Sequence, residues 1–226
     1  MPTAVLTIDG PSGSGKGTVA RQVADRLGWH LLDSGALYRL VAYASRPRGI
    51  PPSDEPANAA IAGHLDVRFG ADTAGNEQIW LEGREVSTHI RTEEAGAGAS
   101  QVAAMPSVRS ALLARQRAFA LPPGLVADGR DMGTVIFPDA ALKIYLTASA
   151  AERARRRHKQ LKDKGLDANL AALSQEIAER DRRDASRPIA PLRPADDAQI
   201  IDSTSMSIDA VVARVLELAA QRFSAK

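Results

Sequence analysis

Residues 4–18 read Ala-Val-Leu-Thr-Ile-Asp-Gly-Pro-Ser-Gly-Ser-Gly-Lys-Gly-Thr. Residues 4–9 form a short run that is typical of a β-strand, and a helical pattern follows the glycine-rich stretch. Glycines let successive backbone N–H groups turn toward an anion, and the N-terminus of the next helix adds positive charge. Lys16 can reach the β- and γ-phosphates of a nucleotide. The stretch therefore predicts a phosphate-binding loop (P-loop) between a strand and a helix.

The end of this loop departs from the general P-loop pattern, in which Ser or Thr follows the lysine and its hydroxyl helps to hold Mg²⁺. Gly17 takes that position here, and Thr18 comes one residue later. The ending Gly-Lys-Gly-Thr resembles that of nucleoside monophosphate kinases rather than that of GTPases or motor ATPases. The direct metal ligand stays open, with Thr18 or Asp128, acting through water, as candidates. A Gly/Ser-rich hairpin that binds nothing is the plainer alternative, but the strand, the lysine and the helix together favour a P-loop.

The composition is that of an ordinary globular enzyme. The chain has 226 residues, 44% hydrophobic and 25% charged, which is enough for one sizeable core with a small insert or lid. A net charge of +2 and an aromatic content of 4% argue against a nucleic-acid partner. The absence of cysteine excludes disulfides and thiolate sites and fits a reducing compartment. Without a leader-like start or an apolar run of ~18 residues, we expect a cytoplasmic protein with no membrane partner.

Strand and helix patterns alternate along most of the chain, which predicts an α/β fold with a parallel, doubly wound sheet. The expected strands are residues 4–9, 30–32, 125–127, 142–146 and 199–201. Between residues 61 and 103, alternating apolar and polar residues predict a small antiparallel sheet instead. We therefore expect a P-loop kinase core made of residues 1–60 and 104–226. An inserted subdomain would cover residues 61–103, and a short basic helical lid residues 151–167.

Polar clusters follow the predicted strands, at the edge where a doubly wound sheet has its sites. Residues 33–39 read Asp-Ser-Gly-Ala-Leu-Tyr-Arg. A helix cap explains the Asp or the Ser but neither Tyr38 nor Arg39. Residues 128–131 read Asp-Gly-Arg-Asp. A turn explains Asp-Gly, but not two carboxylates that flank an arginine able to fork onto phosphate oxygens. Both clusters are expected to contact substrate.

Basic residues gather in the second half of the chain, in the run from Arg153 to Lys159 and at Arg180 and Arg187. A solvated helix face and weak surface ion pairs would account for them individually. Phosphoryl transfer onto a second phosphate accounts for them together. Two polyanions must meet, and the attacking phosphate oxygen is already ionised, so positive charge is needed rather than a general base. The four histidines are dispersed, without the spacing of metal ligands.

The ordered set of motifs resembles that of the bacterial cytidylate kinases over nearly the whole chain. The matching segments are residues 8–18, 32–39, 128–135 and 200–204, with residues 64–69 and 100–103 matching the insert that is typical of the bacterial enzymes. The resemblance implies transfer of the γ-phosphoryl group of ATP to CMP or dCMP with Mg²⁺, giving ADP and CDP or dCDP in pyrimidine nucleotide metabolism. The protein is expected to be a monomer, because no exposed apolar stripe is evident.

The resemblance also implies roles for single residues. Lys16, Arg130, Asp131 and Arg187 are the expected catalytic residues. The ATP site would comprise Gly10, Pro11, Ser12, Gly13, Ser14, Gly15, Lys16, Gly17 and Thr18. The CMP site would comprise Ser34, Tyr38, Arg39, Ser100, Arg109, Arg130, Asp131, Arg180, Asp184 and Arg187. Within it, Ser34, Ser100, Arg109 and Asp131 would contact cytosine, Arg39, Arg130 and Arg187 the phosphate, and Arg180 with Asp184 the ribose.

Cytosine chemistry agrees with this assignment. Asp131 and Ser100 suit the amine at C4, whereas Arg109 suits the acceptors N3 and O2. Uracil would instead place a carbonyl against Asp131.

Two alternative functions stay open at this point. One is another small P-loop kinase, acting on UMP, AMP or shikimate. The other is a P-loop protein that binds nucleic acid through the basic residues 153–164.

Overall fold

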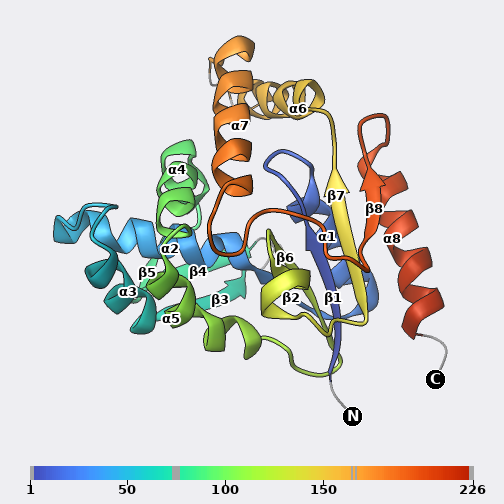
Figure 1. The fold of residues 1–226 in the computed structure, drawn as a ribbon, viewed down its shortest axis with the longest axis horizontal. Coiled ribbons are helices and arrows are strands. Elements are labelled where there is room, and N and C mark those ends of the chain that lie inside the picture. The colour runs from blue at the N-terminus through green and yellow to red at the C-terminus, as the bar shows by residue number, and fades with distance from the viewer. Residues whose placement is uncertain (1–2, 73–76, 164, 166, 224–226) are drawn as a thin grey trace. The chain divides into compact units, whose positions relative to one another are not determined.

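The computed structural model describes residues 3–72, 77–163, 165 and 167–223 (Figure 1). The chain forms two compact units. The first comprises residues 1–33 and 116–226, and the second comprises residues 34–115. The sequence-predicted boundaries at residues 61 and 103 stay a prediction; residue 61 lies within a helix, α3 (Glu55–Gly63).

The first unit is built on a parallel five-stranded sheet with the order β2-β6-β1-β7-β8. Its strands are β1 (Ala4–Asp9), β2 (His30–Asp33), β6 (Gly124–Gly129), β7 (Leu142–Thr147) and β8 (Gln199–Asp202). Its helices are α1 (Lys16–Leu27), η3 (a π-helical turn, Met132–Ile136), α6 (Ala150–Asp163), α7 (Leu170–Ala185) and α8 (Ile208–Phe223). The predicted α/β fold with a parallel sheet is confirmed.

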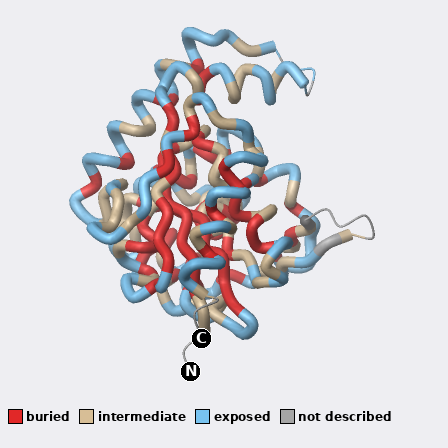
Figure 2. Tube along the Cα trace, turned by 90° about the vertical axis from the view of Figure 1, so that its right-hand side faces the viewer, coloured by how far each residue is buried: buried red, intermediate tan, exposed pale blue. Residues whose placement is uncertain are grey.

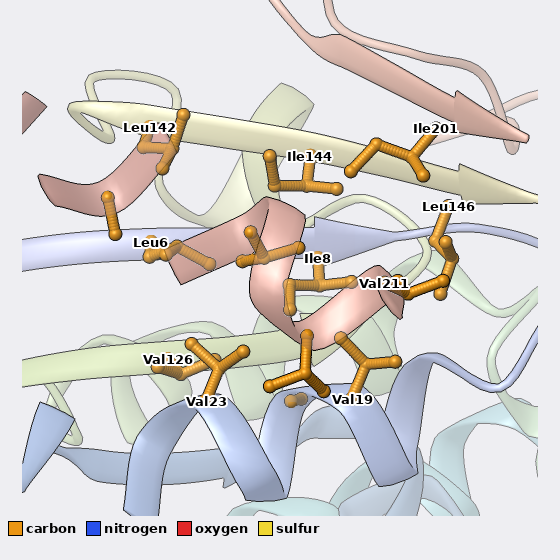
Figure 3. Packing of buried hydrophobic residues seen from close by; sticks show 14 of the residues in the cluster. Leu6, Ile8, Val19, Val23, Val126, Leu142, Ile144, Leu146, Ile201 and Val211 are labelled. Carbon is orange, nitrogen blue, oxygen red and sulfur yellow. The ribbon is translucent and has the colours of Figure 1, made fainter. Parts of the chain in front are cut away.

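The core of this unit lies where α1 and α8 cover one face of the sheet. Leu6 and Ile8, two residues apart on β1, point to the same face and meet Val19 and Val23 of α1 and Val211 of α8 (Figure 3). The central strands are buried along nearly their whole length (Figure 2). This burial explains their continuous apolar runs, because parallel strands are normally covered on both faces. Polar residues that follow the strands are left at the sheet's carboxyl edge.

The second unit combines helices with a small antiparallel sheet of order β3-β4-β5. Its elements are α2 (Ser34–Ser45), η1 (Arg46–Arg48), α3, β3 (Val67–Ala71), β4 (Glu77–Leu81), β5 (Arg84–Glu85), η2 (His89–Arg91), α4 (Glu93–Val102) and α5 (Pro106–Arg117), the last extending into the first unit. The antiparallel sheet expected between residues 61 and 103 is confirmed.

The segment from 61 to 103 also contains a helix that the strand-like pattern did not indicate. The hydroxyl of Thr92 caps α4 by accepting the N–H of Ala95. Small residues let α4 approach α2 closely, since a Cβ on Gly98 would lie 3.0 Å from that of Ala42. Small residues carry a weak hydrophobic signal, so this packing was not evident from the sequence.

The basic segment expected to form a lid contains α6, as predicted, while residues 164 and 166 lie outside the described residues. None of the helices in the described part of the chain has the length and apolar character that a membrane-spanning segment requires.

Candidate active site

The P-loop joins β1 to α1, and glycine is required at two of its positions, at one by a close contact and at the other by the backbone conformation. A Cβ on Gly10 would lie only 2.0 Å from the carbonyl oxygen of Leu146, so no larger residue fits there. Gly15, the N-cap residue of α1, has a φ of 91°, in the left-handed region that favours glycine. The hydroxyl of Ser14 is buried and has no hydrogen-bond partner among the described residues. A buried polar atom of this kind suits a loop that holds a polar ligand.

Lys16 begins α1, and its ammonium group donates to the carbonyl oxygen of Pro11 over 3.4 Å. Loss of hydration lowers the pKa of Lys16 to about 8, and the positive charge of Arg130 acts in the same direction, while Asp128 opposes both. The charges of Arg180 and Asp33 also act on this lysine. An anion bound here would relieve the repulsion between the cations.

Arginines of α6 and α7 contact the P-loop itself. Arg153 of α6 donates to the carbonyl oxygen of Ser12 over 3.0 Å, and Arg156 donates to that of Ser14 over 3.2 Å. Arg180 of α7 donates to the hydroxyl of Ser12 over 3.3 Å. The predicted basic segment is therefore not simply a solvated face, because two of its arginines are attached to the loop.

Asp184 organises a second group of arginines. This buried carboxylate accepts hydrogen bonds from Arg130 over 2.9 Å and from Arg187. Burial opposes its ionisation, but the guanidinium groups of Arg130 and Arg187 outweigh burial and lower the pKa of Asp184. The structure thus brings together two of the three arginines expected to clamp a phosphate. Asp184, which was predicted to contact the ribose, therefore also orients Arg130 and Arg187.

Asp128, at the end of β6, lies beside the position that differs from the general P-loop pattern. A Cβ on Gly17 would lie 3.3 Å from an oxygen of the Asp128 carboxylate. The carboxylate is thus close to where the usual Ser or Thr side chain would begin. Thr18, the other sequence candidate for a metal contact, is exposed.

Asp9 was not singled out from the sequence as a site residue, yet both of its carboxylate oxygens accept backbone hydrogen bonds at this edge. Its two oxygens accept the backbone N–H groups of Met132 and Gly133, each over 2.8 Å. Burial, helped by the negative charges of Asp131 and Asp128, raises the pKa of Asp9 to about 7 against the lowering effect of these N–H groups. A carboxylate directly before a P-loop was the available signal, but its partners lie more than 120 residues away.

The second unit holds the other predicted substrate residues: Ser34, Tyr38, Arg39, Ser100 and Arg109. Ser34, Tyr38, Ser100 and Arg109 are buried. The guanidinium carbon of Arg109 lies 6.0 Å from the centre of the Tyr38 ring. Arg39 donates to the carbonyl oxygens of Ile90 and Thr92 over 2.7 and 3.1 Å. Tyr38 and Arg109 are thus brought together within this unit.

A model of the family described as cytidylate kinase matches residues 6–221 of this chain. The chain belongs to the cytidylate kinase family. It is therefore a nucleoside monophosphate kinase, and ATP is its phosphoryl donor. The cytidylate kinase of Pseudomonas aeruginosa is 63% identical over 213 residues, which cover 94% of this chain and 93% of that protein. The cytidylate kinase of Stutzerimonas stutzeri is 61% identical, and the match covers 98% of this chain and 97% of that protein. The cytidylate kinase of Azotobacter vinelandii is 60% identical, and the match covers 96% of each chain.

Solved structures also match this kinase along most of its length. One is shikimate kinase from Acinetobacter baumannii, with a TM-score of 0.45 and 17% identity, covering 98% of this chain and 95% of that one. The family assignment rests on the family model and on the sequence relatives.

Proposed function

We propose that this kinase transfers the γ-phosphoryl group of ATP to the phosphate of CMP or dCMP. The observation that carries the proposal is the set of positive groups at one sheet edge of the first unit. The positive charges of Arg130 and Arg180 act on Lys16, and Asp184 accepts hydrogen bonds from Arg130 and Arg187. An arrangement of like charges is costly unless anions neutralise it, and two nucleotides supply those anions.

The chemistry needs little from the protein beyond positioning and charge. An ionised oxygen of the CMP phosphate attacks the γ-phosphorus of ATP and forms a new P–O bond. The bond from that phosphorus to the β–γ bridging oxygen breaks, and ADP leaves with the electron pair. We assign the ATP phosphates to the P-loop and Lys16, and the CMP phosphate to Arg39, Arg130 and Arg187. Because Asp184 orients two of these arginines before substrate arrives, little reorganisation is needed during the reaction.

Mg²⁺ is the metal that this chemistry implies, and Asp128 is the residue that best fits it. Carboxylate oxygens and water are the ligands that Mg²⁺ prefers, and the carboxylate lies near the missing side chain of Gly17. Bound with ATP, the ion would neutralise charge on the β- and γ-phosphates. We therefore assign the contact to Asp128, directly or through water, rather than to the exposed Thr18.

We assign recognition of the cytosine base to Ser34, Ser100, Arg109 and Asp131. Asp131 would accept from the C4 amine, which uracil lacks, and Arg109 would donate to N3 or O2. Arg180 and Asp184 are assigned to the ribose. A cytoplasmic location and a monomeric state stay expectations from the sequence.

The test is an ADP-release assay with ATP, Mg²⁺ and CMP, dCMP, UMP or AMP as acceptor. We expect turnover with CMP and dCMP and much lower kcat/KM with UMP and AMP. Lys16→Ala serves as the inactive control, with turnover reduced by about 10²-fold or more, because a preorganised charge at the transferring group is lost. Preference for AMP or UMP would refute the assignment of the acceptor.

A further inference from the structure

Asp9 occupies the last position of β1, directly before the first glycine of the P-loop. It is only 5% exposed, and the proposed reaction assigns it no contact with either nucleotide. A buried carboxylate is costly unless its oxygens are hydrogen-bonded. Both oxygens of Asp9 are satisfied by the start of one element, the π-helical turn η3.

These two bonds perform the task of an N-cap. The first N–H groups of a helical turn have no partner within the turn, and the side chain of the N-cap residue commonly accepts one of them. Asp131 is the N-cap residue of η3, but in the described part of the chain its carboxylate makes no capping hydrogen bond. Asp9 accepts the N–H groups of Met132 and Gly133 instead. The cap of this turn is therefore supplied by Asp9 and not by the Asp131 side chain.

Further hydrogen bonds hold the rest of η3. The carbonyl oxygen of Asp131 accepts the N–H of Ile136 over 3.2 Å, which closes the wide turn. Arg117 donates to the carbonyl oxygens of Ile136 and Val135 over 3.0 and 3.3 Å at the other end. A Cβ on Gly133 would lie 2.9 Å from the Thr7 hydroxyl, so the turn packs directly on β1. The backbone of Asp131 is therefore fixed relative to β1, with Asp9 as the polar anchor.

We propose that Asp9 is a positioning residue for acceptor specificity, which caps η3 from β1 and so sets where Asp131 presents its carboxylate to the base. The inference rests on the proposed function, because it concerns the discrimination between an amine and a carbonyl at C4 of the pyrimidine. A positioning role of Asp9 differs from a purely structural role in its effect on the choice of acceptor. General loosening would reduce the use of all acceptors together, whereas displacement of Asp131 reduces the preference for CMP over UMP.

The experiment measures kcat/KM for CMP and for UMP in the full-length protein and in Asp9→Asn. The amide has one acceptor oxygen and places an N–H donor against a backbone N–H donor. We expect the CMP/UMP ratio of kcat/KM to fall about tenfold in Asp9→Asn. In an Asp131→Ala background, the same substitution should change the ratio less than twofold, because the residue through which Asp9 acts is absent. Asp139→Asn, the same change at an exposed position beyond η3, should leave the ratio unchanged.

Amide hydrogen exchange supplies an independent readout of the capping bonds. Met132 and Gly133 should be protected in the wild type and should exchange at least tenfold faster in Asp9→Asn. An unchanged CMP/UMP ratio, an equal loss in the Asp131→Ala background, or unprotected amides in the wild type would each overturn the inference. Asp9→Glu is the second variant, and failure of both variants to fold would overturn a role in specificity. A wild type that does not phosphorylate CMP would instead refute the proposed function.

Discussion

Asp184 shows how one buried side chain can prepare a phosphate site. Its carboxylate is 1% exposed and accepts from Arg130 and Arg187, which lie on different segments. Charge-assisted bonds of this kind fix the guanidinium groups in orientation. A carboxylate with two arginines leaves net positive charge, which an incoming phosphate can neutralise. The same residue therefore supports both the fold and the proposed acceptor site.

Asp131 is the residue at which we expect base discrimination. In Asp131→Ala, kcat/KM for CMP should fall while that for UMP changes less, so that the ratio narrows by tens-fold. An unpaired polar group on buried cytosine costs about 1–3 kcal/mol, which corresponds to this range. The check is steady-state kinetics with both acceptors at saturating ATP. An unchanged ratio would count against the role of Asp131.

Asp128 is expected to affect the requirement for magnesium. Asp128→Asn keeps the shape of the side chain but removes its charge, so the Mg²⁺ concentration for half-maximal activity should rise about tenfold. The measurement is a Mg²⁺ titration of turnover at fixed ATP and CMP. Thr18→Ala is the matched control at the other candidate metal contact, and it should leave the Mg²⁺ concentration for half-maximal activity unchanged. A shift in the control and none in Asp128→Asn would reverse the assignment.

At the scale of elements, one guanidinium group of α6 contacts both the P-loop and α7. Arg153 donates to the Ser12 carbonyl oxygen, to that of Ala148 over 3.0 Å and to both carboxylate oxygens of Asp181. α6 is rich in charged residues, and the Arg153 side chain, at 6% exposure, is among its few buried groups. The basic helix predicted as a lid is therefore anchored at its first turn by a polar contact rather than by an apolar seam.

Arg153→Ala should lower the free energy of unfolding by about 3 kcal/mol, because it removes one partner of a largely buried ion pair. Arg155→Ala is the matched control on the same helix. Its side chain is 65% exposed and pairs with Glu152 over 3.1 Å, so its loss should cost less than about 1 kcal/mol. Urea unfolding of both variants provides the comparison. Equal effects would show that Arg153 is no anchor.

At the scale of the whole molecule, stability should depend on pH through Asp9. Its folded pKa of about 7 lies above the ordinary value of 3.8. Between these values the folded state retains a proton that the unfolded state has lost, so this group's contribution to stability falls as pH rises toward 7. Asp9→Asn cannot titrate. Between pH 5.5 and pH 8, the wild type should therefore lose about 2 kcal/mol of unfolding free energy relative to Asp9→Asn.

The measurement is urea unfolding of both proteins at the two pH values. Asp139→Asn corrects for the loss of a carboxylate at an exposed site. A difference between wild type and Asp9→Asn that stays constant with pH would contradict the raised pKa.

Local signals were sufficient for much of the fold and the site. The P-loop could be identified because its glycines, its lysine and the flanking strand and helix are adjacent in the chain. The polar residues at the strand ends could be identified because parallel strands place their carboxyl ends at one edge. Helix α4 escaped prediction because its small residues carry little periodic signal and pack closely on α2.

The amino-acid sequence by itself determined the phosphate loop, the parallel α/β core and the family, since each depends on residues close together or on an ordered set of motifs. Only the tertiary structure decided which charges meet. Asp184 pairs with Arg130 across 54 residues, Arg153 with Asp181 across 28, and Asp9 with Met132 across 123. Such partners are chosen by the order of strands and the packing of helices. A charged residue in a sequence carries no mark of the distant residue that will neutralise it.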